Sequence, residues 1–91
     1  MIFVKNPEIV VQKNEAGFIL LDMDSGQFYS LYDVSSYIWE CIEQALSQEE
    51  IVKKMVVEYE MSEKQAFEDV EKFLNELHAE KIIKKKSHKK G

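Results

Sequence analysis

The residue types that most often carry catalysis are few in this chain, and their spacing does not bring them together. The only two histidines are His78 and His88, and the single cysteine is Cys41. Cys41 follows Ile38 by three residues in an apolar helical repeat, so it is expected to be a small buried hydrophobic residue. No Cys-x-x-Cys or His-x-x-x-His pair is present to hold a metal ion. These residues therefore predict neither nucleophilic catalysis nor a metal site.

Carboxylates are too frequent to mark an acid–base site. Asp22 with Asp24, and Glu68 with Asp69, are close pairs among 17 acidic residues, and carboxylates at this density usually form solvated faces. General acid–base catalysis instead needs a positioned pair with matched pKa values. Gly26 stands alone, so no glycine-rich loop is available to cradle a phosphate. The chain is expected to have no catalytic residue and no cofactor, and not to be an enzyme.

The charge of the chain is unevenly distributed. Its net charge is −5, but six of its 12 lysines follow Glu80, and all 17 acidic residues lie between Glu8 and Glu80. Arginine, whose planar guanidinium reads phosphates well, is missing from the sequence. A strongly acidic body without arginine is a poor nucleic-acid binder, because phosphate contacts dominate that affinity.

Three short segments near the N-terminus have the composition of β-strands. Residues 8–13, 18–23 and 27–31 are rich in β-branched, aromatic and aliphatic side chains. Gly26 closes a tight turn before the last segment and is free to adopt a positive φ. Because strands joined by so short a turn pair antiparallel, these segments predict a three-stranded antiparallel sheet.

The apolar pattern changes to helical spacing after residue 32. Asp33 or Ser35 is a suitable cap for a first helix, and Ser47 with Glu50 forms a capping box for a second. Apolar residues recur at steps of three and four along both helices. Those expected to face the core are Val34, Tyr37, Ile38, Cys41, Ile42 and Ala45 in the first helix, and Ile51, Met55, Val56 and Tyr59 in the second.

A third helix is expected after Ser62, which caps it. Its apolar stripe consists of Ala66, Phe67, Val70, Phe73, Leu74 and Leu77. Lys81-Ile82-Ile83 then returns to an extended apolar pattern and is expected to add a short strand. Strands followed by helices indicate an α+β fold, a three-stranded antiparallel sheet followed by three helices, with the apolar face of the sheet packed on the helices.

The last strand of the predicted sheet carries neither a charge nor a proline. Natural edge strands usually carry such residues, because their unpaired N–H and C=O groups recruit other strands. If this strand is also the edge in space, an extended peptide can add to it, with the third helix as an apolar wall. The alternative is that Phe28, Tyr29 and Leu31 only fill the core and that a helix covers the edge.

The ordered combination of these segments resembles the PqqD-like family. The hairpin from Phe18 to Leu31 is similar to the family's Leu-Leu-Asp…Ser/Thr-Gly-x-aromatic-aromatic-x-Leu pattern, and the resemblance extends over about Glu8 to Ile83. Asp33 stands where the family commonly has asparagine, which also caps a helix. The further matching positions are Ile38-Trp39, Ser47 to Val52, Asp69-Val70, Phe73-Leu74, Leu77 and Lys81-Ile82-Ile83.

This resemblance implies a winged helix-turn-helix-like fold and the role of a recognition element for ribosomally synthesised and post-translationally modified peptides (RiPPs). Such a protein binds the leader of a precursor peptide as an added strand, antiparallel to the third strand and against the third helix. It then presents the precursor to a processing enzyme. On this sequence the peptide-binding positions implied are Gln27, Phe28, Tyr29, Ser30 and Leu31 on the strand, and Phe67, Val70, Glu71, Leu74 and Leu77 on the helix.

Several pathways fit this resemblance. Separate proteins of this kind serve lasso peptide, pyrroloquinoline quinone and radical-modified peptide biosynthesis. The lysine-rich, arginine-free composition is typical of low-GC Gram-positive organisms, in which separate proteins resembling this one commonly serve lasso pathways. The resemblance therefore favours the lasso pathway, in which the partner is a leader peptidase. A PqqD-type chaperone for a radical SAM enzyme is the alternative. A winged-helix DNA-binding protein is the rival from another class, and the acidic third helix argues against it.

The expected organisation is a peptide-recognition domain over residues 1–83 and a basic disordered tail over residues 84–91. The tail either keeps the protein in solution or contacts an acidic partner or membrane surface. The N-terminus does not resemble a signal peptide, and no apolar run is long enough for a membrane span. With its single cysteine, the chain is expected to be cytoplasmic, either as a monomer or as a dimer joined through the exposed edge.

Overall fold

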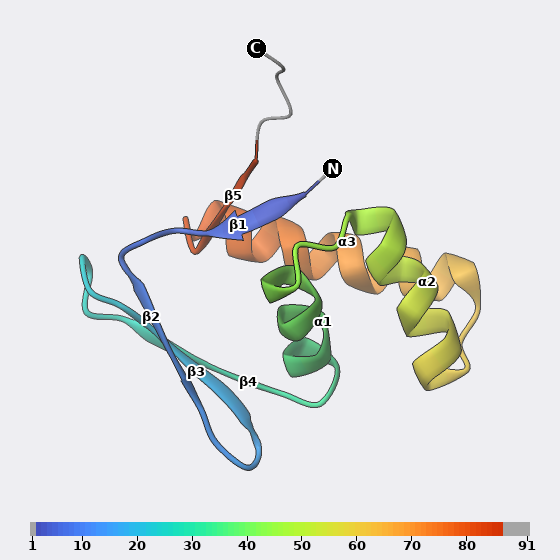
Figure 1. The fold of residues 1–91 in the computed structure, drawn as a ribbon, viewed down its shortest axis with the longest axis horizontal. Coiled ribbons are helices and arrows are strands. Elements are labelled where there is room, and N and C mark those ends of the chain that lie inside the picture. The colour runs from blue at the N-terminus through green and yellow to red at the C-terminus, as the bar shows by residue number, and fades with distance from the viewer. Residues whose placement is uncertain (1, 87–91) are drawn as a thin grey trace.

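Five strands and three helices form an α+β fold in the computed structural model, which describes residues 2–86. The main sheet is antiparallel with the strand order β2 (Ile9–Lys13), β3 (Gly17–Asp22) and β4 (Phe28–Tyr32). Helices α1 (Val34–Glu43), α2 (Gln48–Tyr59) and α3 (Glu63–Ala79) follow. Figure 1 shows the sheet at one side of the molecule, α1 at its centre and α2 at the other side. The predicted fold class is confirmed.

The two ends of the described chain form a second, smaller sheet. β1 (Phe3–Lys5) pairs antiparallel with β5 (Ile83–Lys85), with Val4 opposite Lys84. No strand was predicted at the N-terminus, and the strand expected at 81–83 begins two residues later. Beyond residue 83 the described chain continues in β5 to Lys85, and Lys86 N–H donates to Ile2 O at 2.8 Å. The rest of the expected tail, residues 87–91, lies outside the described residues.

Two of the three predicted helix caps are present. Ser47 Oγ accepts from Glu50 N–H, and Glu50 Oε1 accepts from Ser47 N–H, so the capping box of α2 is complete. Ser62 Oγ accepts from the N–H of Gln65 at the start of α3. These caps satisfy backbone donors that the first turn of a helix leaves unpaired.

The prediction for the cap of α1 was wrong. Asp33 stands at the N-cap position, but its side chain makes no capping hydrogen bond, and Ser35 lies inside the helix. The φ of Asp33 is 57°, outside the extended region in which an N-cap side chain reaches the backbone donors of the first turn. Its backbone oxygen instead accepts from Tyr37 N–H and from Ser36 Oγ.

One hydrophobic core joins both sheets and all three helices. Leu20, Trp39, Met55 and Ala66 are fully buried within it. Three residues expected inside are exposed: Ala45 in the turn after α1, Tyr59 at the end of α2 (37% exposed) and Phe67 on α3 (47% exposed). Ala45 is exposed because α1 ends at Glu43, before the predicted apolar stripe does. The core residues contributed by β1, β5 and the loop before β5 are Phe3, Ile82 and Ile83.

Candidate functional site: a strand edge beside a helix

β4 is the edge strand of the main sheet. It is last in the order β2–β3–β4, so it pairs with β3 on one side only. Within residues 2–86, no strand or loop pairs with its other side through the backbone. The last strand of the sheet in the sequence is therefore also its edge in space, which is the condition on which strand addition depends.

The backbone groups that face away from β3 belong to alternate residues of β4. At the start of the hairpin, Asp22 N–H donates to Gln27 O at 2.8 Å. Opposed residues in an antiparallel ladder alternate between hydrogen-bonded and non-hydrogen-bonded pairs, so Tyr29 and Leu31 bond to β3 in this register. The N–H and C=O groups that face outward are those of Phe28, Ser30 and Tyr32.

The side chains of β4 alternate between the two faces of the sheet. Leu31 is buried and Tyr29 is partly buried, and both pack on the core side. Phe28 and Tyr32 lie on the open face, where they are 68% and 59% exposed. An added strand would continue both faces, because its own side chains alternate in the same way.

A cleft separates β4 from the C-terminal half of α3. Leu31, Leu77 and Ile82 give it an apolar floor, and the carboxylates of Glu76 and Glu80 stand on its helical wall. The complete set of lining residues is Gly26, Gln27, Phe28, Tyr29, Ser30, Leu31, Ser35, Phe73, Glu76, Leu77, Ala79, Glu80 and Ile82.

The structure brings together only part of the site inferred from the sequence. All five strand positions, Gln27, Phe28, Tyr29, Ser30 and Leu31, line the cleft, together with Leu77 on α3. The other four helix positions do not line it. Val70 and Leu74 are fully buried in the core, while Phe67 and Glu71 line a different hollow between α2 and α3.

The helical wall of the cleft lies nearer the C-terminus of α3 than expected. Phe73, Glu76, Leu77 and Glu80 form it, and their spacing of three and four residues places them on one face. Sequence reasoning assigned Phe73 to the core and assigned no site role to Glu76, Glu80 or Ile82. The spacing of the apolar residues indicates which face of α3 is turned inward. It does not indicate where β4 passes along the helix, because that depends on the tertiary packing.

Tyr29 links the two walls of the cleft. Its hydroxyl lies 3.0 Å from Gln27 Oε1 and 3.2 Å from Glu80 Oε1, and it donates toward these oxygens. Partial burial raises the pKa of Tyr29, and the hydrogen bond and negative charge of Glu80, with the charge of Asp22, raise it further. The hydroxyl therefore stays protonated at neutral pH and keeps its donor role toward these two oxygens.

The residues considered for catalysis are not assembled into a site. The ring of His78 contacts Phe3 edge-on, with 6.3 Å between the ring centroids, and Cys41 is buried in the core. Asp22 Oδ1 accepts from the N–H of Asp24 and stabilises the turn. Within residues 2–86, no three His, Cys, Asp or Glu side chains gather as a metal site would require. None of the helices described there has the length and apolar character needed to cross a bilayer.

Comparisons with known proteins agree with this architecture. The sequence profile of the family described as coenzyme PQQ synthesis protein D (PqqD) matches residues 17–83. A comparison with curated proteins gives no match. Two solved structures match with TM-scores of 0.86.

The first structure is described as lasso peptide synthetase B1 complexed with the leader peptide. Its sequence is 25% identical to this one, and the match covers 93% of this chain and 100% of the synthetase B1 chain. The second, TbiB1 in complex with the TbiA(beta) leader peptide, is 24% identical and covers 92% and 98%; at that identity it supports the fold alone. This chain belongs to the PqqD family, as a PqqD-like RiPP recognition element.

Proposed function

We propose that this protein binds the leader segment of a ribosomally synthesised precursor peptide as a fourth strand on β4. The observation that carries this proposal is the unpaired outer edge of β4 beside an apolar cleft. Family membership and the leader-peptide complex of the similar synthetase B1 support it. The added strand runs antiparallel to β4, with one row of its side chains in the cleft against α3.

Backbone pairing alone gives such a complex little affinity. The outward N–H and C=O groups of Phe28, Ser30 and Tyr32 can each bond to the guest strand, at a net gain of about 0.5–1.5 kcal/mol per bond. Ordering a flexible peptide costs a similar total. Affinity must therefore come from apolar guest side chains buried against Leu31 and Leu77, at about 25 cal/mol per Å². We expect dissociation constants near the micromolar range, about −8 kcal/mol.

The protein acts by holding and presenting its ligand, not by catalysing a reaction. We propose that it delivers the precursor to a processing enzyme, with a lasso peptide leader peptidase favoured and a radical SAM enzyme as the alternative. The matched synthetase B1 supports the lasso assignment. The cytoplasmic setting, the role of the lysine tail and the oligomeric state remain predictions.

The sharpest test replaces one outward-facing donor of β4. Ser30 is exposed and its N–H points away from β3, so proline at this position removes a donor for the guest strand and spares the pairing with β3. Proline at Tyr29 would instead break the ladder to Leu20. The matched control is Ser30→Val, which keeps the N–H and loses the hydroxyl.

The probes are the fluorescently labelled TbiA(beta) leader peptide and peptides selected on this protein from a displayed random library. We expect Ser30→Pro to weaken the binding of every probe at least about tenfold, the effect of roughly 1.4 kcal/mol, and Ser30→Val to bind like the wild type. Circular dichroism checks that both variants are folded. If Ser30→Pro binds the selected peptides as tightly as the wild type does, strand addition to β4 is wrong.

A further inference from the structure

The cleft opens at one end into a second, polar hollow. The two share Gln27, Tyr29, Ala79 and Glu80, so a strand lying in the cleft leads directly into the hollow. The shared residues lie where β4 begins and α3 ends. The Tyr29 hydroxyl, held toward Glu80 at 3.2 Å, stands at the boundary between the apolar floor and the polar hollow.

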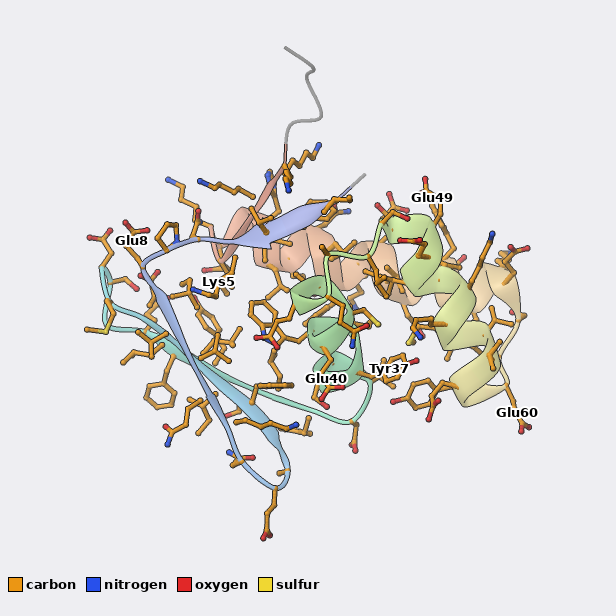
Figure 2. All side chains as sticks on the ribbon, in the orientation of Figure 1. Lys5, Glu8, Tyr37, Glu40, Glu49 and Glu60 are labelled. Carbon is orange, nitrogen blue, oxygen red and sulfur yellow. The ribbon has the colours of Figure 1, made fainter. Side chains whose placement is uncertain are left out.

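The hollow has an excess of negative charge. Glu8, Asp22, Asp24 and Glu80 contribute carboxylates, and Lys81 is the cation among its lining residues. The nearby Lys5 is engaged elsewhere, because its Nζ donates to Ile9 O at 2.7 Å. Figure 2 shows Glu8 at the end of the molecule farthest from Glu60. Among residues 2–86, none of the four carboxylates forms an ion pair.

Sheet geometry fixes which guest residue reaches the hollow. A guest residue opposite a residue of β4 points to the same face of the sheet. Guest residues opposite Leu31 and Tyr29 therefore point into the cleft, two positions apart. The next guest residue on that side stands opposite Gln27, at the mouth of the hollow. In an antiparallel guest, these three positions follow one another from the N-terminal to the C-terminal side.

We propose that the preferred leader carries the pattern apolar–x–apolar–x–basic, and that its lysine or arginine enters the hollow between Glu80 and the carboxylates of Asp22 and Asp24. This inference rests on the proposed function and adds to it the chemistry of the ligand. The apolar residues match the floor of the cleft, and the cation complements the excess of carboxylates. The spacing follows from the side-chain alternation along β4.

The experiment selects ligands without assuming a sequence. A displayed library of random peptides is panned against the full-length protein, and the enriched peptides are aligned on their two apolar residues. We expect lysine or arginine to be enriched two positions C-terminal to the second apolar residue. The same panning on Glu80→Gln should reduce this enrichment. Glutamine preserves an acceptor for Tyr29, so the variant removes charge with little change in shape.

An enriched synthetic peptide then measures the size of the effect. We expect Glu80→Gln to weaken its binding about three- to fivefold near 0.05 M salt, with most of this difference lost by about 0.5 M. Glu60→Gln, an equal charge change at the other end of the molecule, should leave the affinity unchanged. Replacing the basic residue of the peptide with glutamine should remove the difference between Glu80→Gln and the wild type.

The possible outcomes separate this inference from the function on which it rests. If the selected peptides bind in a manner sensitive to Ser30→Pro but show no cation at this position, the inference is wrong and strand addition stands. The same conclusion follows if Glu60→Gln and Glu80→Gln have equal effects. If the selected peptides are insensitive to Ser30→Pro, strand addition itself is wrong.

Discussion

Asp33 is one of four non-glycine residues with a positive φ among those that the structure describes. Its φ and ψ are 57° and −126°, a combination that glycine adopts more readily than any residue with a Cβ atom. Its side chain gives no capping hydrogen bond in return. Holding a residue in such a region lowers the stability of the folded state by roughly 1–3 kcal/mol. The turn between β4 and α1 holds Asp33 in this conformation, and α1 begins at Val34 without a side-chain cap.

We therefore expect Asp33→Gly to raise the free energy of unfolding by about 1 kcal/mol, because relief of the strain exceeds the entropy that glycine adds to the unfolded chain. Urea denaturation monitored by circular dichroism measures the change. Glu58→Gly, the same replacement type at an exposed position within α2, should instead cost about 1 kcal/mol. A loss of stability in Asp33→Gly would contradict this account of the turn.

Cys41 illustrates how burial decides the reactivity of a side chain. Cys41 is 2% exposed, and burial raises the pKa of its thiol, although the charge of Lys54 partly opposes this shift. Less thiolate therefore forms at neutral pH, and thiolate is the reactive species. We expect iodoacetamide to label the folded protein far more slowly than the urea-unfolded protein, as followed by mass spectrometry. Rapid labelling of the folded state would show that α1 does not shield this residue.

At the scale of elements, alternation along β4 makes a prediction that needs no mutation. The N–H groups of Tyr29 and Leu31 face β3, whereas those of Phe28, Ser30 and Tyr32 face outward. In amide hydrogen exchange followed by NMR, the first pair should be protected in the free protein and the other three should exchange rapidly. A bound peptide should then protect these three amides. Uniform protection along β4 in the free protein would mean that its edge is already occupied.

The sequence predicts an element well when the residues that determine it are close together in the chain. The sheet and its edge, the capping box of Ser47 and the cap of Ser62 follow from neighbouring residues, and the structure contains them. The pairing of β1 with β5 joins residues about 80 positions apart through two strands of three residues. Strands this short have no measurable period. Nothing local therefore indicates that Phe3 pairs with Lys85, or Lys5 with Ile83.

The helical half of the candidate site was harder to predict for a related reason. Leu77 was inferred from the family resemblance and does line the cleft, but Val70 and Leu74 lie in the core. α3 is 17 residues long and β4 is five, so the strand can run beside only part of the helix. Which part lies beside the strand is set by the tertiary packing of the sheet and the helices. Spacing gives the face of the helix, and only the tertiary structure gives the position along it.

At the scale of the whole molecule, ligand binding and stability must be linked. A peptide that pairs with β4 binds only the folded chain, because the edge and the cleft come from segments that meet on folding. At a concentration of 100 times Kd, such a ligand stabilises the fold by about 2.7 kcal/mol. In a domain of this size we expect Tm to rise by roughly 11–22 °C, at about 4–8 °C per kcal/mol. At the same peptide concentration, Ser30→Val should show the same rise in Tm and Ser30→Pro at most about half of it, as differential scanning calorimetry measures. Equal shifts in the two variants would mean that the peptide stabilises the molecule from a surface other than the outer edge of β4.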